Sequence, residues 1–458
     1  MKTKLTLKLF FLLLLAGPVI IGIGFPRSAP KADLPNIILI IADSLRPDHL
    51  GCYGYGRNTS PNIDQLAKQG VIFREAISAG GWTCESIPSI LTGTYSLTHQ
   101  IRDWDDLRNI SIETVASQLS SKEYQCVILS NHRPVKLLDI RDGFQEVYIS
   151  DNFEDKQPVI NAQNFTDRVI AWLKAYTGGP FFLFIHYHSP HFPYRPPEPY
   201  KSLYLFDKFM GKSESVPISD SRNNEAFQGI NNIPYLVAED NITDPNYYIS
   251  QYDGAIAYLD AQIGRLLESL EDIGLDKNTL IIVTADHGEM LGEHNIYFTH
   301  QKGYEEDIRV PLIIRFTKLL PQDRAINRQV SLIDLAPTIL EIAGLGKPSY
   351  MQGESLLAFI RPLRIYHAKY AFSSNRDTLV LRSKEWKLIS DDWADELYNL
   401  KQDPGEQHNL AGRKLSKLLQ LKKRLNKLEE EISSPIISRN GRTITEKEKE
   451  YLRSLGYF

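Results

Sequence analysis

The feature that most constrains the fold is a series of short, continuous apolar runs that alternate with helical patterns. Continuous runs rich in β-branched or aromatic residues are typical of strands buried on both faces of a sheet. Strands that alternate with helices predict an α/β fold with a large, mostly parallel sheet. The expected strands are residues 36–42, 124–130, 180–186, 279–285 and 310–315, and the expected helices are residues 112–119, 161–175, 248–270 and 332–343.

The pattern changes beyond about residue 360. Three short alternating runs come before a helical pattern rich in Lys and Glu at residues 415–432. This order predicts a small antiparallel sheet covered by one helix and appended to the main sheet. We therefore expect a main domain at residues 35–360 and a C-terminal subdomain at residues 361–458. The three runs are residues 378–382, 386–390 and 396–400.

The N-terminus has the composition of an export signal. Lys2, Lys4 and Lys8 precede an apolar run of 17 residues at positions 9–25. A basic head before a short apolar stretch is typical of a signal peptide, although a membrane span needs only slightly more, about 20 residues. We interpret residues 1–30 as a cleaved signal peptide or a retained N-terminal anchor. Either interpretation predicts a protein outside the cytoplasm, periplasmic or secreted.

Composition excludes two other classes of protein. The chain of 458 residues has 52 Lys and Arg against 56 Asp and Glu, so its formal net charge is −4, and it has no long basic run. This balance argues against a nucleic-acid partner. Its three cysteines cannot form a disulfide framework, and none has the C-x-x-C spacing of a metal site. The fold must therefore depend on its hydrophobic core.

Acidic side chains follow two of the expected strands at the point where each strand ends. Asp43 comes directly after residues 36–42, and Asp286 with His287 comes directly after residues 279–285. Open α/β sheets bind ligands at this edge. A carboxylate that leaves a hydrophobic strand is costly unless a positive group meets it. Two carboxylates and an imidazole form a ligand set for a divalent metal ion.

Several longer motifs occur in an order that resembles the sulfatase family of the alkaline phosphatase superfamily. The resemblance extends from about Pro35 to Phe458. It rests on DSLRPDHLGCYGY after the first strand, on LTG, PHFPY, ADHGEMLGEH and YEEDIRVPLIIR along the chain, and on LRSLGY near the end. The resemblance implies a large mixed, mostly parallel sheet flanked by helices, a catalytic domain at residues 35–360, and hydrolysis of sulfuric or phosphoric esters.

The family's nucleophile stands ten residues before the Gly of LTG, and this position is Thr83 here. In sulfatases it is a Cys or Ser that is converted to formylglycine within a C-x-P-x-R signature. Cys84 lies one place too late and Ile87 stands at the Arg position, so we expect no formylglycine and interpret Cys84 as a packed thiol. Ser44 replaces the family's second Asp, and Asn131 replaces its sulfate-binding Lys, where we expect it to contact substrate. These departures resemble branches of the superfamily that use an unmodified Thr.

The resemblance also implies roles for side chains around the nucleophile. His191, in PHFPY, lies at the family's substrate-contacting position, and His300 lies where relatives have the donor to the leaving group. An imidazole with a pKa near 6.5 can protonate a departing alkoxide. Lys302 is a neighbouring cation that we expect to contact the substrate. His132 and His186 are weaker candidates for a functional role.

The metal prediction is one divalent ion held by Asp43, Asp286 and His287, with Thr83 as the reacting ligand. Coordination lowers the pKa of a hydroxyl, as zinc lowers that of water from 15.7 to about 7. Oxygen-rich coordination suits Ca²⁺, Mg²⁺ or Mn²⁺ and leaves the identity of the ion open. A second metal ion is not expected, because Asp253 in the helical pattern QYDGAIAYLDAQIG has no His beside it.

Three functions remain open at this point. The first is an exported hydrolase of sulfate or phosphate esters, and Thr83 favours phosphorus because a sulfated Thr lacks the elimination route of formylglycine. The second is a membrane-anchored transferase of phosphoglycerol or phosphoethanolamine groups, whose members usually carry several spanning helices. The third is a binding protein that keeps the fold without catalysis. The expected partner is a small-molecule, glycan or lipid ester.

Overall fold

The computed structural model covers the predicted main domain and most of the C-terminal subdomain. The predicted signal peptide or anchor lies outside the described residues and stays a prediction. Within the described part of the chain, no helix has both the length and the hydropathy that a membrane span requires. The structure describes residues 34–104, 112–138, 140–149, 161–205, 214–219, 229–300, 302–360, 370–433 and 445–454.

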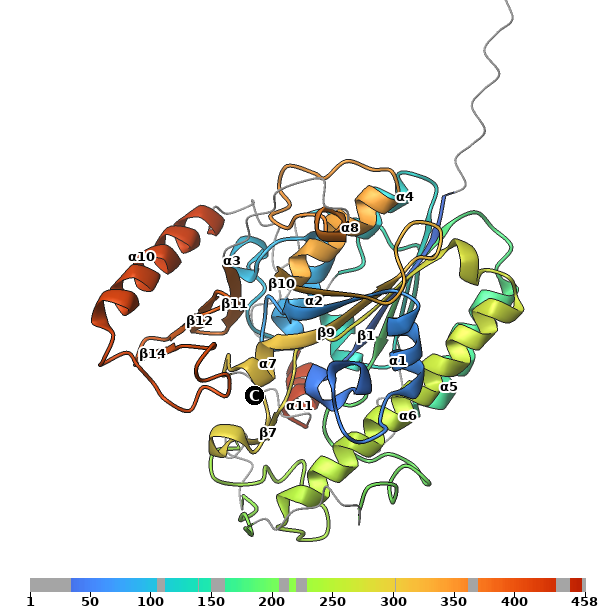
Figure 1. Cartoon of the computed structure of the whole chain (residues 1–458). Coiled ribbons are helices and arrows are strands. Elements are labelled where there is room, and N and C mark those ends of the chain that lie inside the picture. The colour runs from blue at the N-terminus through green and yellow to red at the C-terminus, as the bar shows by residue number, and fades with distance from the viewer. Residues whose placement is uncertain are drawn as a thin grey trace, which may run out of the picture. The chain divides into compact units, whose positions relative to one another are not determined.

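An eight-stranded sheet forms the centre of the main domain (Figure 1). Its strand order is β10-β2-β9-β6-β1-β5-β3-β4, and only β9 runs antiparallel to its neighbours. This mixed, mostly parallel sheet confirms the predicted fold class. The strands are β1 (Asn36–Ala42), β2 (Val71–Ile77), β3 (Gln125–Ser130), β4 (Glu146–Ile149), β5 (Phe181–Tyr187), β6 (Thr279–Thr284), β9 (Arg309–Arg315) and β10 (Arg324–Ser331).

The central strands are the continuous apolar runs. Every residue of β1, β5 and β6 is buried, because helices cover both faces of the sheet and leave no face for water. The strands β2, β4 and β10 have no counterpart among the expected strands. Arg74 and Glu75 interrupt β2, β4 is four residues long at one edge of the sheet, and β10 is partly exposed at the other edge. None of the three therefore has a continuous apolar run.

Helices form a layer on each side of the sheet (Figure 1). The long helix α6 contacts α1 and α5 on one side, and α8 contacts α2 and α4 on the other. The helix α4 begins three residues later than expected, because Thr114 caps it by accepting from the backbone of Ala116 and Ser117. The helices of the main domain are α1 (Pro61–Lys68), α2 (Thr83–Thr92), α3 (Ser96–His99), α4 (Val115–Ser120), α5 (Ala162–Ala175), α6 (Pro245–Asp272), α7 (Glu305–Ile308), α8 (Leu335–Ile342) and α9 (Leu357–Ile360).

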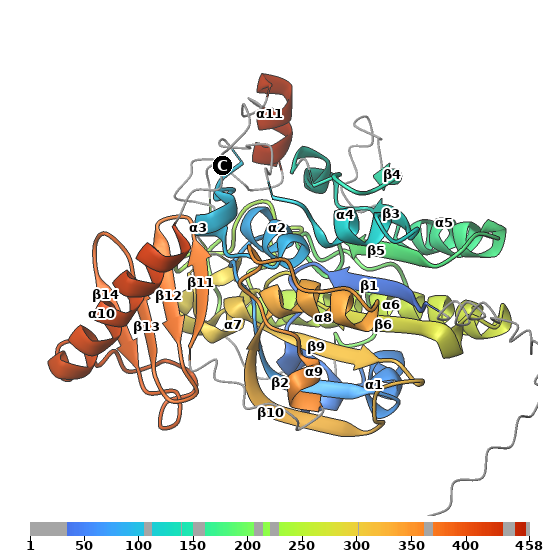
Figure 2. The same ribbon diagram turned by 90° about the horizontal axis from the view of Figure 1, so that it is seen from above.

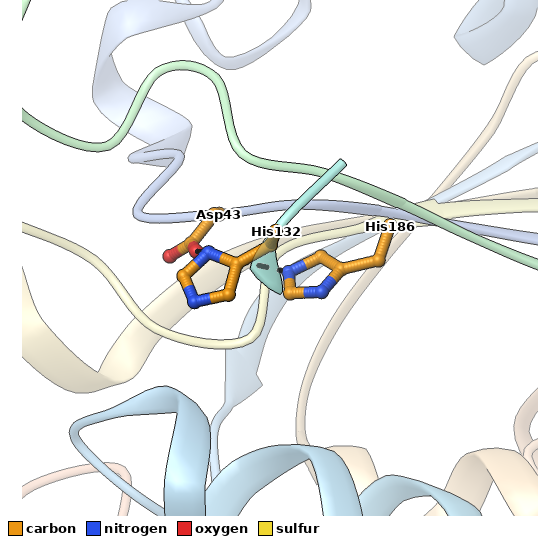
Figure 3. A group of neighbouring side chains, drawn as sticks. All are labelled: Asp43, His132 and His186. Atoms are coloured by element: carbon orange, nitrogen blue, oxygen red, sulfur yellow. Dashed lines mark ion pairs between the residues drawn. The ribbon is translucent and has the colours of Figure 1, made fainter. Parts of the chain in front are cut away.

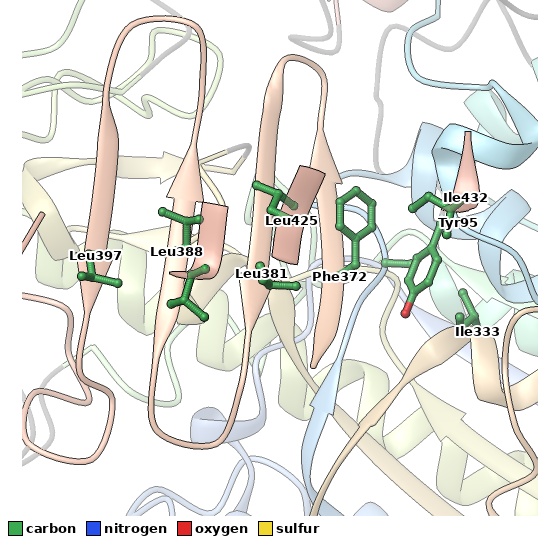
Figure 4. Packing of buried hydrophobic residues seen from close by; sticks show 10 residues of the cluster. Tyr95, Ile333, Phe372, Leu381, Leu388, Leu397, Leu425 and Ile432 are labelled. Carbon is green, nitrogen blue, oxygen red and sulfur yellow. The ribbon is translucent and has the colours of Figure 1, made fainter. Parts of the chain in front are cut away.

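The C-terminal subdomain contains the predicted small antiparallel sheet, with β11 facing the main domain (Figure 2). Its strands are β11 (Ala371–Asn375), β12 (Thr378–Arg382), β13 (Lys387–Ser390) and β14 (Asp395–Tyr398). The helix α10 (Leu415–Ile432) covers this sheet with Leu421, Leu425 and Ile432 (Figure 4). Tyr95 and Ile333 of the main domain belong to the same apolar cluster, so the two parts share a core. A short hairpin, β7 (Met290–Leu291) and β8 (Tyr297–Thr299), and a last helix, α11 (Glu446–Ser454), complete the described elements.

Candidate active site

The predicted acidic residues meet at one edge of the main sheet. The strands β1 and β6 are parallel neighbours, with Ile41 opposite Thr284. Asp43 and Asp286 each lie two residues beyond this pair, so both reach the same edge of the sheet. The backbone N–H of Ser44 donates to Asp286 Oδ1 at 3.4 Å, which ties the two strand ends together. Both carboxylates are fully buried.

Thr83 lies beside these two carboxylates although it comes from another segment of the chain. It is the first residue of α2, after a loop that leads from the end of β2. The Ser78 hydroxyl in that loop donates to the backbone carbonyl of Asp286 and holds the loop against the strand end. Thr83 Oγ1 lies 3.4 Å from His287 Nε2. The N-terminus of a helix carries a partial positive charge, which favours negative charge on this oxygen.

The ring of His287 lies between Asp43, Asp286 and Thr83. Its Nε2 lies 3.4 Å from Asp43 Oδ1 and 3.6 Å from Asp286 Oδ2. Its Nδ1 lies 2.9 Å from the carbonyl oxygen of Gly288 and donates to it. Because Nδ1 carries the proton, the lone pair of Nε2 faces the two carboxylates and Thr83, as in a metal-ligating histidine.

The electrostatics of the site call for a positive group. Burial, and then the charges of Asp286 and Glu289, raise the pKa of Asp43 well above its ordinary value. Among the described residues, Asp286 Oδ2 has no hydrogen-bond partner, and Asp43 Oδ2 lies 2.5 Å from His132 Nδ1 (Figure 3). Buried carboxylates without partners are rare unless they bind a cation. The donor set of two carboxylates, one imidazole nitrogen and one hydroxyl therefore fits a divalent metal ion.

Both predicted catalytic histidines lie at the site. The ring of His300 is centred 4.4 Å from that of His287, and the ring of His191 is 5.4 Å from that of His300. His191 Nδ1 lies 2.7 Å from its neighbour's carbonyl oxygen at Phe192, which fixes the ring. Burial lowers the pKa of His300 to about 4, so its imidazole is neutral at pH 7 in the free protein.

The two predicted substrate-binding residues have different surroundings. Asn131 is buried at the end of β3, where its Oδ1 accepts from the backbone N–H of His188 at 2.7 Å. Lys302 is half-buried, and its backbone N–H donates to Asp307. Asn131 therefore holds the backbone at His188 in place, and Lys302 lies in a loop that Asp307 fixes. A contact of either residue with substrate stays a prediction.

Several residues of the site have no role in the sequence-based expectations. His188 lies near Asp43, and burial raises the pKa of Glu289, which lies 3.4 Å from His300 Nδ1, to about 8. The sequence signal for His188 is the His-x-His motif that it forms with His186 at the end of β5. Asp253, for which the sequence predicts no metal role, contacts His49 at 2.6 Å and Arg57 at 2.7 Å.

The C-terminal sheet also reaches the site. The turn between β11 and β12 holds the guanidinium of Arg376 4.4 Å above the ring of Trp82, the residue before Thr83. The charge of Arg376 contributes to the lowered pKa of His300, after burial. Arg376 Nε also lies 3.4 Å from Asp103. A cationic side chain of the small sheet is therefore part of the surroundings of Thr83.

Comparison with known proteins agrees with this architecture. The family model for sulfatases matches residues 35–345, and the model for the C-terminal part of N-sulphoglucosamine sulphohydrolase matches residues 292–431. The sulfatase match defines the class of the protein as an ester hydrolase. Because the first model covers more than half of the chain, the protein belongs to the sulfatase family, and the predicted family is confirmed.

Similar proteins include several sulfatases. The N-acetylglucosamine-6-O-sulfatase of Bacteroides thetaiotaomicron is 25% identical, with 83% of each chain covered. The human iduronate 2-sulfatase is 28% identical, with 74% of each chain covered. The solved phosphonate monoester hydrolase of Agrobacterium radiobacter has a TM-score of 0.72 at 21% identity, covering 87% of this chain and 96% of its own. A structure described as a complex with D-glucosamine-2-N,6-O-disulfate has a TM-score of 0.69 at 24% identity, covering 87% of this chain and 97% of its own.

Proposed function

We propose that the protein is a divalent-cation-dependent hydrolase of sulfuric or phosphoric esters that uses the Thr83 hydroxyl as its nucleophile. The observation that carries this proposal is the convergence of Thr83 Oγ1, Asp43 and Asp286 on one atom, His287 Nε2, at 3.4 to 3.6 Å. These groups come from the ends of β1 and β6 and the start of α2, so their meeting is a product of the fold.

The same four residues are the proposed ligands of the cation. A divalent ion at such a site lowers the pKa of a coordinated hydroxyl and neutralises charge on the group that is transferred. The sequence pattern favours Ca²⁺, Mg²⁺ or Mn²⁺, and the imidazole of His287 argues against a pure preference for Ca²⁺. The buried Asp286 Oδ2, which has no hydrogen-bond partner among the described residues, supports this assignment.

The proposed reaction has two displacements. The neutral imidazole of His300 or His191 takes the proton of the Thr83 hydroxyl, and the Thr83 oxygen bonds to the sulfur or phosphorus as the bond to the ester oxygen breaks. The departing alcohol then takes this proton from the same imidazole, whose ring lies beside that of His287. Water then attacks the Thr83 ester at sulfur or phosphorus, which releases sulfate or phosphate and restores the hydroxyl.

The substrate class we propose is an oxyacid ester on a glycan or a small molecule. Relatives named as N-acetylglucosamine-6-O-sulfatase and iduronate 2-sulfatase support a sugar as the alcohol. The unmodified Thr83 favours a phosphoric over a sulfuric ester, because phosphorylated Thr is open to direct attack by water. We also propose that the protein acts outside the cytoplasm, on the basis of the basic and apolar N-terminal sequence.

The experiment is a panel of aryl sulfate, aryl phosphate, bis-aryl phosphate and phosphonate esters, assayed with Mg²⁺, Mn²⁺, Ca²⁺ and Zn²⁺. Wild type is compared with Thr83→Ala and with Thr83→Ser, which keeps the hydroxyl. We expect one ester class to be preferred, a loss of about 10⁴-fold or more for the Ala variant, and retained activity for the Ser variant. Equal turnover by the Ala variant would contradict the proposal. Inactivity of wild type on all four esters would favour a transferase or a binding protein.

A further inference from the structure

A cationic side chain of the C-terminal subdomain lies beside the residue that precedes Thr83. Arg376 belongs to the turn between β11 and β12, and its guanidinium carbon lies 4.4 Å from the centre of the Trp82 ring. We infer that Arg376 is a specificity-determining residue that binds a second anionic group, a carboxylate or a sulfate, on the alcohol part of the substrate. The inference rests on the proposed function and narrows its substrate class to esters of acidic alcohols.

Backbone hydrogen bonds fix the position of this turn relative to Thr83. The end of β11 pairs with the loop that leads to Thr83, because the Gly81 N–H donates to the Ser374 carbonyl oxygen at 3.1 Å. The Ser374 N–H in turn donates to the Ala79 carbonyl oxygen at 3.1 Å. Asn375 packs directly against Gly81, where an added Cβ would lie 2.7 Å from Asn375 Nδ2. The turn and the loop before the nucleophile therefore form one packed unit.

The conformation of Arg376 is specific. Its φ of 50° lies in the left-handed region, which favours Gly, Asn and Asp in such turns. A long cationic residue in this conformation indicates a constraint other than the turn itself. The face of Trp82 attracts the guanidinium through a cation–π contact, and Trp104 holds the Trp82 ring edge-to-face with ring centres 6.2 Å apart. The side chain is therefore held over a ring that is itself fixed.

Two guanidinium groups meet at this point. Arg102 donates to the backbone carbonyl of Arg376. Asp103 Oδ2 lies 3.4 Å from Arg376 Nε, and Glu85 Oε1 lies 3.8 Å from Arg102 Nε. Both distances are longer than the span of about 2.7–3.2 Å that is typical of an N–H···O bond. A guanidinium has five N–H donors in a planar fork that matches carboxylate, sulfate and phosphate groups, so an anion of the substrate gains charge-assisted hydrogen bonds here.

Burial separates Arg376 from the groups that surround the reacting atom. Thr83, Asp43 and Asp286 are fully buried, whereas 36% of the Arg376 side chain is exposed. The transferred sulfuryl or phosphoryl group must lie among the buried groups, because Thr83 Oγ1 attacks it in the proposed reaction. Arg376 lies nearer to the surface, yet its charge acts on the site, since it adds to the effect of burial in lowering the pKa of His300. We therefore assign its contact to the alcohol part of the substrate.

The test compares matched aryl esters of the class that wild type prefers. One ester has a neutral phenyl group, and two others carry a carboxylate or a sulfonate on the ring. The measured quantity is the ratio of kcat/KM for each charged ester to kcat/KM for the neutral one, which cancels effects common to all esters. We expect Arg376→Gln to lower at least one ratio by about tenfold, and Arg376→Lys to lower it less. The ester with the larger fall identifies the anionic group.

A matched control and the salt dependence separate this contact from general effects. Arg424 also lies over an aromatic ring, that of Tyr370, and 37% of its side chain is exposed, but it belongs to α10. Arg424→Gln should leave both ratios unchanged. Because the Arg376 side chain is partly exposed, salt at about 1 M should lower the ratio of wild type toward that of Arg376→Gln.

The inference and the proposed function fail in different ways. Turnover by wild type with unchanged ratios in Arg376→Gln would overturn the inference and leave the proposed function intact. If Arg376→Gln does not fold, a wild-type ratio that does not fall with salt overturns the inference.

Turnover of no ester by wild type would contradict the proposed function, and binding then tests the inference. Calorimetry on Thr83→Ala should show that one charged ester binds about tenfold more tightly than the neutral ester, and Arg376→Gln in the same background should remove this difference. A difference that persists in the double variant, or none in Thr83→Ala, would overturn the role of Arg376.

Discussion

Two buried clusters of charged side chains in this protein differ in how their charges are balanced. The strand-end cluster is acidic and holds no Lys or Arg, and among the described residues its Asp286 Oδ2 has no hydrogen-bond partner. The junction network, where the main domain meets the small sheet, pairs each acid with a base at 2.6 to 3.1 Å. The strand-end cluster is Asp43, Asp286 and His287, and the junction network is Glu75, Glu305, Arg382, Lys387 and Glu406.

The difference separates a structural role from a functional one. Buried charges are tolerated when the protein supplies their partners, and the junction network supplies its own. Among the described residues, no Lys or Arg pairs with Asp43 or Asp286 of the strand-end cluster. A buried acidic cluster without Lys or Arg partners is a candidate binding site, whereas a network in which every carboxylate contacts a Lys or Arg connects parts of the fold.

The largest expected effect comes from breaking the strand-end cluster. Asp286→Asn removes a proposed ligand and should lower kcat/KM by about 10³-fold or more, measured with the preferred ester. The same change removes a buried charge that no Lys or Arg among the described residues balances, so the metal-free protein should be equally or more stable to urea. A large loss of stability without metal would show that the two clusters do not differ as described.

The junction network should respond in the opposite way. Arg382→Met takes a buried guanidinium away from the partly buried Glu75 and leaves Glu305 with Lys387 alone, and it should cost about 3–5 kcal/mol of unfolding free energy. The exposed pair of Arg424 and Glu431 provides the control, since Arg424→Met should cost less than about 1 kcal/mol. Equal effects of the two Arg variants in urea denaturation would contradict a structural role for the network.

Metal removal should sharpen the comparison further. If the ion binds only the folded state, its presence at 100 times its dissociation constant adds about 2.7 kcal/mol of stability. A chelator should therefore lower the Tm of wild type and of Arg382→Met by similar amounts. The chelator should lower the Tm of Asp286→Asn by less. An equal fall in Tm for all three proteins would contradict the assignment of Asp286 as a metal ligand.

The smallest effect concerns pH. Burial alone would raise the pKa of Glu305, but Arg382 and Lys387 outweigh it and hold the pKa well below its ordinary value of 4.5. Because the folded-state pKa is the lower one, this stabilisation is present above about pH 4.5 and is lost as the pH falls toward the folded value. The stability advantage of wild type over Glu305→Gln should shrink between pH 6 and pH 3.5 in urea titrations. An advantage that grows over this range would contradict the pairing.

The sequence predicts the parts of the molecule that local pattern determines. The continuous apolar runs mark β1, β5 and β6, and the amphipathic pattern gives the exact bounds of α10. Motif spacing identifies Thr83, and the strand ends identify Asp43 and Asp286. The structure brings these three residues together.

The remaining features depend on long-range contacts. The role of Asp253 could not be predicted, because its partners His49 and Arg57 are about 200 positions away. The convergence of His132 and His188 on Asp43 depends on the pairing of β5 with β1 and β3. The junction network depends on the docking of the small sheet, which no local pattern encodes.

The most direct measurement is a search for a covalent intermediate. Wild-type protein is mixed with the preferred ester, quenched with acid within milliseconds, digested and analysed by peptide mass spectrometry, with Thr83→Ala as the control. The account predicts a sulfuryl or phosphoryl group on Thr83 itself, absent from the control. A group on another residue, or undiminished turnover by the control, would contradict the assignment of Thr83 as the nucleophile.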